Sequence, residues 1–299
     1  MKRRDFVATC SGLLTVGIGQ RVLAIDPIER PKPGQLRLSL AAYSMRKYLG
    51  KSRAGTPPSM DLFQFVDFCF DNCIPGAELT SYYFPEKVDD SYLMKLKRHC
   101  HMRGITISGG AISNDYCQLD TVKLADDLEH TRTWIDHYAK LGAPAIRIFA
   151  GRQPKGEDLA VTLKRCAQHC QIACQHAVRQ GVMLALENHG GVTEHAKDLL
   201  QIVQQVDSPA IGINFDSGNF RSSADPYAEL AKIAPYAVNA QIKVEIHRGN
   251  TDEPADLAKI LQILRDVGYS GWVALEYESE EEPKIAIPRY IAQLKKLIG

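Results

Sequence analysis

The sequence carries almost no net charge. Its 36 Lys and Arg residues nearly balance its 35 Asp and Glu residues, which leaves a formal net charge of +1. No overall electrostatic field therefore draws the chain to nucleic acid or to an anionic membrane. Internal repeats and low-complexity segments are absent as well. We expect no nucleic-acid partner, and any ligand must be recognised by a local site.

The sequence also lacks an apolar run long enough to span a bilayer. The candidate run, residues 6–18, is short and interrupted by glycines. It directly follows Arg3 and Arg4, and small residues come after it at a cleavable position, so residues 1–24 resemble a twin-arginine signal peptide. We expect export to the periplasm by this route, a linker at 25–35, and no stable membrane association. The alternative is a basic N-terminal helix that packs on the domain.

Cysteine is present in a pattern that does not favour disulfides. Of the eight cysteines, Cys10 falls in the predicted signal, which leaves an odd number. Cys166, Cys170 and Cys174 recur every four residues, so they stack on one face of a helix, where disulfide geometry is poor. We interpret them as buried packing residues. A metal site shared with nearby histidines is the alternative.

The rest of the chain alternates between apolar strands and amphipathic helices. Eight strands are expected, at residues 36–44, 76–81, 105–112, 144–151, 182–188, 211–219, 237–246 and 271–278. Eight strands that alternate with helices over about 260 residues predict an α/β fold, a single-domain (β/α)8 TIM barrel at residues 36–299. A doubly wound sheet is the alternative, but the first strand lacks the Gly-rich phosphate fingerprint that usually follows it there.

Three acidic residues stand at the ends of predicted strands. Glu187, Asp216 and Glu276 each follow an apolar run, and the active site of a TIM barrel lies at these strand ends. Three carboxylates that converge would repel one another, and a hard divalent cation such as Mg²⁺ or Mn²⁺ removes that cost. The alternative is that the acids form ion pairs with Lys243 and Arg147. For Arg147 we favour an interior pair with an acid over binding of an anionic ligand.

Four motifs carry a resemblance to a known family. The series ALENHGG, INFDSGN, QIKVE and ALEYE resembles the xylose-isomerase-like TIM barrels, a group of sugar phosphate isomerases and epimerases, over about residues 36–297. The resemblance implies one divalent metal ion, Mn²⁺ or Mg²⁺ first and Co²⁺ or Zn²⁺ after them. The ligands that it implies are Glu187, Asp216, Gln241 and Glu276.

Two positions depart from the common pattern of that family. Gln241 stands where a His is usual, and an amide oxygen is a weaker ligand than imidazole, which makes Zn²⁺ less favourable. Asn219 stands where many members have a His that contacts the substrate, so the substrate itself is open. A DNA-repair endonuclease shares this barrel, but it needs a basic face and a richer set of histidines.

The same positions predict a reaction. Epimerisation next to a carbonyl needs a base on one face of the substrate and an acid on the other, and Glu187 and Glu276 are the expected pair. Lys243 is expected to steady the developing oxyanion. Substrate contacts are expected from His189, Asn219, Tyr82 and Glu245. The alternatives are a supporting or loop role for His189, plain packing for Tyr82, and a supporting or structural role for Glu245.

Export favours a free sugar or keto-sugar over a phosphorylated one. The leading expectation is therefore a metal-dependent sugar isomerase or epimerase. The alternatives are β-elimination on a 3-keto-glycoside and a non-catalytic sugar-binding barrel. The oligomeric state is open, with a homo-oligomer among the outcomes.

Overall fold

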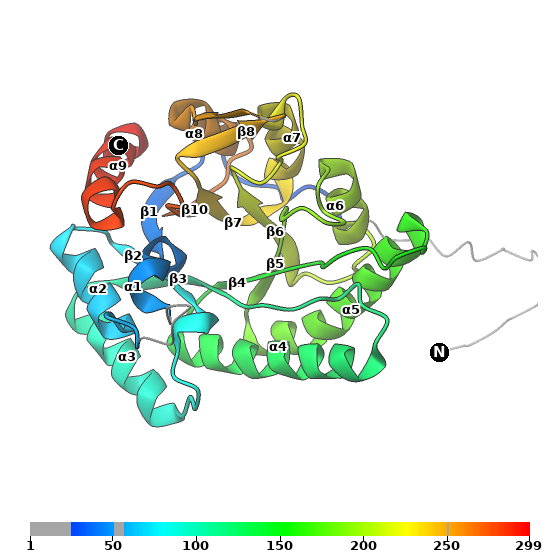
Figure 1. Cartoon of the computed structure of the whole chain (residues 1–299), viewed down its shortest axis with the longest axis horizontal. Coiled ribbons are helices and arrows are strands. Elements are labelled where there is room, and N and C mark those ends of the chain that lie inside the picture. Colours follow the sequence, from blue (N-terminus) through cyan, green and yellow to red (C-terminus); the bar gives the residue numbers. More distant parts are fainter. Residues whose placement is uncertain (1–24, 51–56, 250) are drawn as a thin grey trace, which may run out of the picture.

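Eight parallel strands close into a barrel in the computed structural model, which describes residues 25–50, 57–249 and 251–299 (Figure 1). The order around the barrel is β1-β10-β7-β6-β5-β4-β3-β2. The strands are β1 (Leu36–Ala41), β2 (Gly76–Thr80), β3 (Thr106–Ala111), β4 (Ala145–Ile148), β5 (Met183–Glu187), β6 (Ile211–Asp216), β7 (Ala237–Ile242) and β10 (Gly271–Leu275). The predicted single-domain (β/α)8 barrel is confirmed. The predicted signal at 1–24 lies outside the described residues and stays a prediction.

Helices surround the barrel on its outer side (Figure 1). They are α2 (Leu62–Asp71), α3 (Asp90–Met102), α4 (Thr121–Leu141), α5 (Leu159–Gln180), α6 (Ala196–Val203), α7 (Pro226–Ile233), α8 (Leu257–Asp266) and α9 (Pro283–Ile298). Six of them, α2 to α5, α7 and α8, begin at an Asp whose side chain accepts a backbone N–H of the first turn. The two longest, α4 and α5, end at Gly142 and Gly181, which adopt the left-handed conformation that glycine tolerates best. None of the described helices combines the length and the apolar character needed to span a bilayer.

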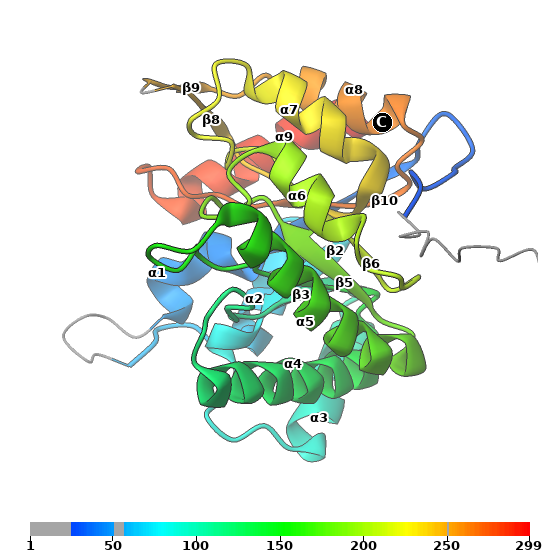
Figure 2. The same cartoon turned by 90° about the vertical axis from the view of Figure 1, so that its right-hand side faces the viewer.

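Several short elements were not predicted. A 3-10 turn (Ala42–Met45) and α1 (Arg46–Leu49) follow β1, and an antiparallel hairpin of β8 (Glu245–Arg248) and β9 (Thr251–Pro254) follows β7. The strand predicted to run to residue 246 ends at Ile242, because the chain leaves the barrel there and turns into the hairpin. Figure 2 shows the hairpin and α1 at one end of the barrel and the segment before β1 at the other.

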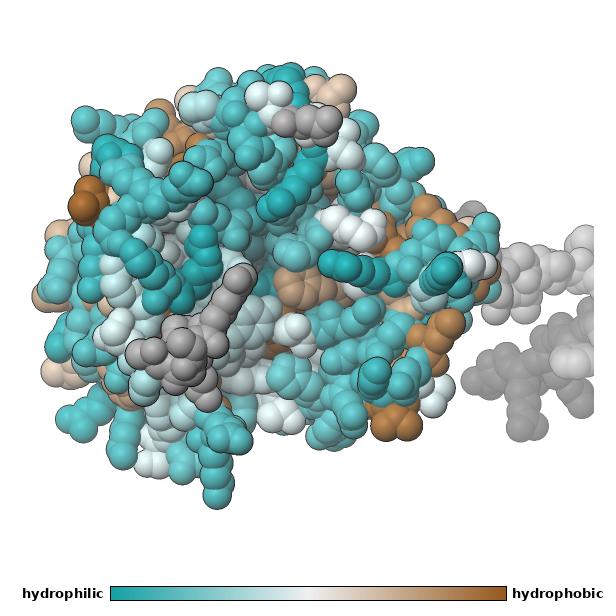
Figure 3. Space-filling view, viewed as in Figure 1, coloured by the Kyte–Doolittle hydropathy of each residue, from teal (hydrophilic) through white to brown (hydrophobic). Residues whose placement is uncertain are grey.

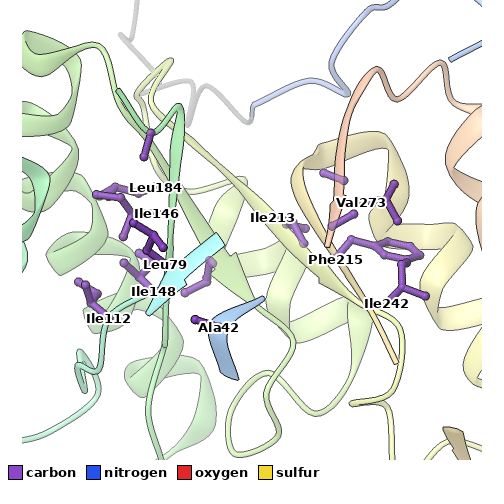
Figure 4. Close-up of a cluster of buried hydrophobic side chains, with 14 of the residues drawn as sticks. Ala42, Leu79, Ile112, Ile146, Ile148, Leu184, Ile213, Phe215, Ile242 and Val273 are labelled. Carbon is purple, nitrogen blue, oxygen red and sulfur yellow. The ribbon is translucent and has the colours of Figure 1, made fainter. Parts of the chain in front are cut away.

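Apolar side chains fill the space between the barrel and its helices. Alternate residues of a strand point to opposite faces, so one set packs outward and the other faces the barrel interior. Ile146, Leu184 and Ile213 belong to the outward set and are fully buried (Figure 4). The apolar core between strands and helices therefore does not depend on the side chains that point into the barrel.

The interior of this barrel contains polar side chains, whereas branched apolar residues usually fill the interior of a TIM barrel. Glu78 on β2 accepts hydrogen bonds from Asn239 and Gln241 on β7, at 2.7 and 2.6 Å. Strands β2 and β7 are separated in the ring by β1 and β10, so these bonds cross the interior. Asn214 on β6 joins the network by accepting from Asn239 at 2.8 Å. This polar layer lies directly below the strand ends that carry the predicted site.

Candidate active site

The predicted metal ligands stand at neighbouring strand ends. Glu187 ends β5 and Asp216 ends β6, while Gln241 lies near the end of β7 and Glu276 directly follows β10. The register pairs Asp216 with Gln241, whereas Glu187 pairs with Asn214, and Gln241 also pairs with Ala274, two residues before Glu276. Each of the four residues is at most 5% exposed. Parallel strands thus place all four near the same end of the barrel, but the side chain of Gln241 is engaged inside it.

Glu187 is held by two partners. Its Oε2 atom lies 3.1 Å from Arg147 Nε, and its Oε1 atom accepts a hydrogen bond from Asn219 Nδ2 at 2.9 Å. The expectation that Arg147 forms an interior pair with an acid is confirmed. Burial raises the pKa of Glu187 to about 8, although the charge of Arg147 opposes that rise. A carboxyl whose pKa lies near neutrality is suited to both taking and giving a proton.

Lys243 lies among three carboxylates. Its Nζ atom is 3.3 Å from Asp216 Oδ2, 3.7 Å from Glu276 Oε2 and 2.5 Å from Glu278 Oε2. Burial opposes the charge of Lys243, but the three acids outweigh it and raise the pKa of its ammonium group above the usual value. Glu278 was missed in the sequence. Its signal was its place two residues after Glu276, which turns it to the same side of an extended chain.

Gln241 has both amide atoms engaged inside the barrel. Its Nε2 atom donates to Glu78 Oε1 at 2.6 Å, and its Oε1 atom accepts from Asn214 Nδ2 at 2.6 Å. Burial raises the pKa of Glu78, while the hydrogen bonds from Asn239 and Gln241 lower it. The roles of Asn214 and Asn239 were not foreseen, and their signal was the alternation of polar residues along the sixth and seventh strands.

These contacts test whether the residues fit a divalent ion. Glu187 is occupied by Arg147 and Asn219, and the amide of Gln241 points into the network with Glu78. Among the residues that the structure describes, no three His, Cys, Asp or Glu side chains are arranged to hold a metal. As they lie, the four predicted ligands do not form a metal site. The ion stays a prediction, and no step below depends on it.

A cavity of 210 Å³ opens above these side chains, and Figure 3 shows the hollow at this end of the barrel. Its lining residues are Tyr43, Tyr82, Arg147, Phe149, Glu187, His189, Lys243, Glu276 and Glu278. The cavity therefore brings together five of the residues predicted to serve the site. Asp216 and Gln241 lie below it, and Asn219 contacts it through Glu187 and Lys243.

A second, larger cavity of 590 Å³ adjoins the first. The two share Phe149 and His189 in their linings, and the rings of these residues lie 4.3 Å apart, centroid to centroid. The outer cavity is lined mainly by the segments after β3, β4 and β5, which include Asn114, Asp115 and Arg152. Phe149 was not singled out in the sequence, where it reads as an ordinary apolar strand residue.

Glu245 lies apart from the central cavity. It starts β8 in the hairpin and is exposed, and it lines a neighbouring cavity of 230 Å³ with Arg46, Arg221 and His247. Tyr82 is 44% exposed at the mouth, with its hydroxyl 3.4 Å from Arg147 Nη1. Burial, followed by the charge of Arg147, lowers the pKa of His189 to about 4, so its ring is neutral at physiological pH.

Solved structures share this fold. An L-ribulose 3-epimerase matches with a TM-score of 0.70 and 18% identity, over 88% of this chain and 95% of that chain. A D-psicose 3-epimerase from Clostridium cellulolyticum H10, solved with D-tagatose, matches with a TM-score of 0.71 and 14% identity over 88% and 99%. A 3-keto-D-glucoside 4-epimerase from E. coli matches with a TM-score of 0.69 and 14% identity, over 88% of this chain and 100% of that chain. At these identities the likeness shows the fold.

The sequence comparisons give two further results. A search of curated protein sequences finds no match. The family model described as a xylose isomerase-like TIM barrel matches residues 63–297, which is most of the chain and includes the strand ends of the site. The chain therefore belongs to the xylose isomerase-like TIM barrel family.

Proposed function

We propose that this chain moves a proton at a carbon next to the carbonyl of a sugar or keto-sugar, with Glu187 and Glu276 as the acid–base pair. The observation that carries the proposal is that two buried carboxyl groups line one small cavity at the barrel mouth. They come from β5 and the end of β10, which are separated in the ring by β6 and β7. A substrate between them meets one carboxyl on each side. Sugar epimerases among the structural neighbours support this class of reaction.

The surroundings of the two acids suit that role. Asn219 hydrogen-bonds one oxygen of Glu187 and the charge of Arg147 lies beside the other, so the carboxylate is positioned before substrate arrives. Burial raises the pKa of Glu276 well above its usual value, although the charge of Lys243 opposes that rise. One carboxylate takes the C–H proton, the electron pair forms the enediolate, and the other carboxyl returns a proton to the opposite face.

The oxygen of the carbonyl gains negative charge in this step. Lys243 is positioned to stabilise it, because its ammonium group reaches the same cavity and hydrogen-bonds Asn219 Oδ1 at 3.1 Å. Tyr82 and the Phe149–His189 pair form walls against which a sugar ring can pack. The free, unphosphorylated state of the sugar rests on the proposed export signal.

Solvent exchange tests the proposal. The full chain is incubated in D₂O with a panel of free ketoses and 3-keto-glycosides, once with added Mn²⁺ or Mg²⁺ and once without, and NMR detects deuterium at the carbon next to the carbonyl. An epimerase places deuterium in both epimers. A chain that binds a sugar of the panel but exchanges no proton under either condition is a sugar-binding barrel, and the proposal is then wrong.

A β-elimination on a 3-keto-glycoside is the second candidate. It uses the same proton removal, but the bond to the aglycone breaks and an unsaturated sugar remains. The outer cavity favours it, because the 590 Å³ space beyond Phe149 and His189 accommodates a leaving group that a free ketose does not have. The same D₂O assay separates the two reactions, since only elimination releases a free aglycone.

A further inference from the structure

The ammonium group of Lys243 occupies the centre of the acidic cluster. It contacts Asp216, Glu276 and Glu278, which come from β6 and from the segment after β10, and it donates to Asn219 Oδ1 at 3.1 Å. The side chain is only 10% exposed. A single protein cation thus faces three carboxylates from both sides of β7, the place where the sequence pattern predicted a divalent ion.

The position of Lys243 is built into the backbone around it. Its backbone N–H donates to Ser217 Oγ at 2.8 Å, which ties the end of β7 to the loop after β6. The stem passes directly over Gly218, where a Cβ atom would lie 2.7 Å from Lys243 Cδ. A glycine at this point therefore leaves room for the stem. Two neighbouring residues of one loop hold the lysine on its path toward the carboxylates.

The other predicted metal ligands already have protein partners, and the ammonium group of Lys243 is the positive charge nearest to Asp216 and Glu276. Arg147 and Asn219 take the two oxygens of Glu187, and the amide of Gln241 is divided between Glu78 and Asn214. Asp216 Oδ1 accepts from the backbone N–H of Gly218 at 2.8 Å. Its buried Oδ2 atom has no hydrogen bond and faces Lys243 Nζ. An ion held by Asp216 and Glu276 would sit against a fixed positive charge.

We propose that Lys243 supplies the positive charge of this site in place of a divalent metal ion. Resting on the proposed function, the same ammonium group then receives the negative charge of the substrate oxygen. When a carboxylate removes the C–H proton, the electron pair moves into the carbon–carbon bond and the carbonyl electrons onto that oxygen, beside Lys243. Return of a proton to carbon reverses both shifts, so no electron is gained or lost.

The test measures Mn²⁺ binding rather than turnover. The full chain is treated with a chelator, dialysed and titrated with Mn²⁺, with electron paramagnetic resonance to count free ion and calorimetry to measure heat. We expect the wild type to bind no stoichiometric Mn²⁺ in the micromolar range. Lys243→Met removes the charge and keeps most of the stem, so it should gain one Mn²⁺ per chain. Adding Asp216→Asn should abolish that gain.

Two control variants locate the effect. Lys243→Arg keeps a cation in the cluster and should bind no Mn²⁺. Lys140→Met removes an exposed lysine that pairs with Asp90 on the outer surface, and it should behave as the wild type. Circular dichroism checks that each variant is folded.

Two results would overturn the proposal. One is stoichiometric Mn²⁺ binding by the wild type that Asp216→Asn removes, which needs no lysine variant to fold. The other is a folded Lys243→Met that gains no Mn²⁺. The two proposals fail in different ways. If the chain exchanges no proton on any sugar but gives the expected Mn²⁺ titrations, the proposed function is wrong and the role of Lys243 stands. If the chain is active and the wild type binds Mn²⁺ at Asp216, the function stands and the role of Lys243 is wrong.

Discussion

Arg147 Nε lies 3.1 Å from Glu187 Oε2, with the two side chains 5% and 3% exposed. A buried ion pair of this kind adds little net stability, because both charges lose their water. It does fix geometry, since Asn219 takes the other oxygen of Glu187 and Arg147 also donates to the backbone carbonyl of Ile112 at 2.9 Å. The pair therefore orients the carboxyl group on which the proposed reaction depends.

Removing Arg147 should destabilise the fold. Arg147→Met leaves Glu187 buried without its cation, and we expect the free energy of unfolding to fall by about 3 kcal/mol. Urea denaturation followed by circular dichroism measures it. Arg147→Met combined with Glu187→Gln should recover part of the loss. The control is Arg132→Met on α4, an exposed residue near Glu129, which should change stability by less than about 0.5 kcal/mol. Equal losses in the two arginine variants would contradict the buried pairing.

Glu276→Gln should abolish proton transfer without unfolding the chain. The amide keeps the size of the side chain but cannot carry a proton, so deuterium exchange into a substrate found by the panel should fall by about a hundredfold or more. Glu129→Gln, the same change at an outer residue of α4 that is 70% exposed, is the matched control. A Glu276→Gln variant that exchanges as fast as the control would remove Glu276 from the acid–base pair.

Cys73 should be the fast-reacting thiol of the described chain. It is exposed, whereas the six other described cysteines, at 69, 100, 117, 166, 170 and 174, are buried. The burial of Cys166, Cys170 and Cys174 confirms the packing interpretation of that helix. Burial raises the pKa of Cys100 and Cys174 to about 12, so these two stay protonated and unreactive at about pH 8. In a Cys10→Ser chain, Ellman's reagent should show one fast thiol that Cys73→Ser removes. Several fast thiols would contradict the packing.

The export prediction rests on Arg3 and Arg4. Replacing both by lysine should keep the chain in the cytoplasm, because the twin-arginine route reads the pair and not only its charge. Cell fractionation followed by immunoblotting measures the distribution. A chain that lacks residues 1–24 gives the fully cytoplasmic reference. Unchanged periplasmic levels in the lysine variant would show that the segment is not a twin-arginine signal.

The sequence alone determined the fold and the level of the site. Apolar runs alternating with amphipathic helices predict the barrel, because this signal acts over a few neighbouring residues. The rule that parallel strands end at one mouth then placed Glu187, Asp216 and Glu276 together. The polar residues Asn239, Gln241 and Lys243 alternate along the seventh predicted strand, which indicates that one face of this strand is polar.

Only the tertiary structure decided which charge meets which. Glu78 bonds Gln241 across the barrel, Arg147 pairs with Glu187, and Lys243 reaches Glu276 and Glu278. These partners lie from 33 to 163 residues apart in the sequence, so no local pattern ranks one pairing over another. Closure of the ring sets their distances, and in a buried site distance decides whether an acid is balanced by a lysine, by an arginine or by a bound ion.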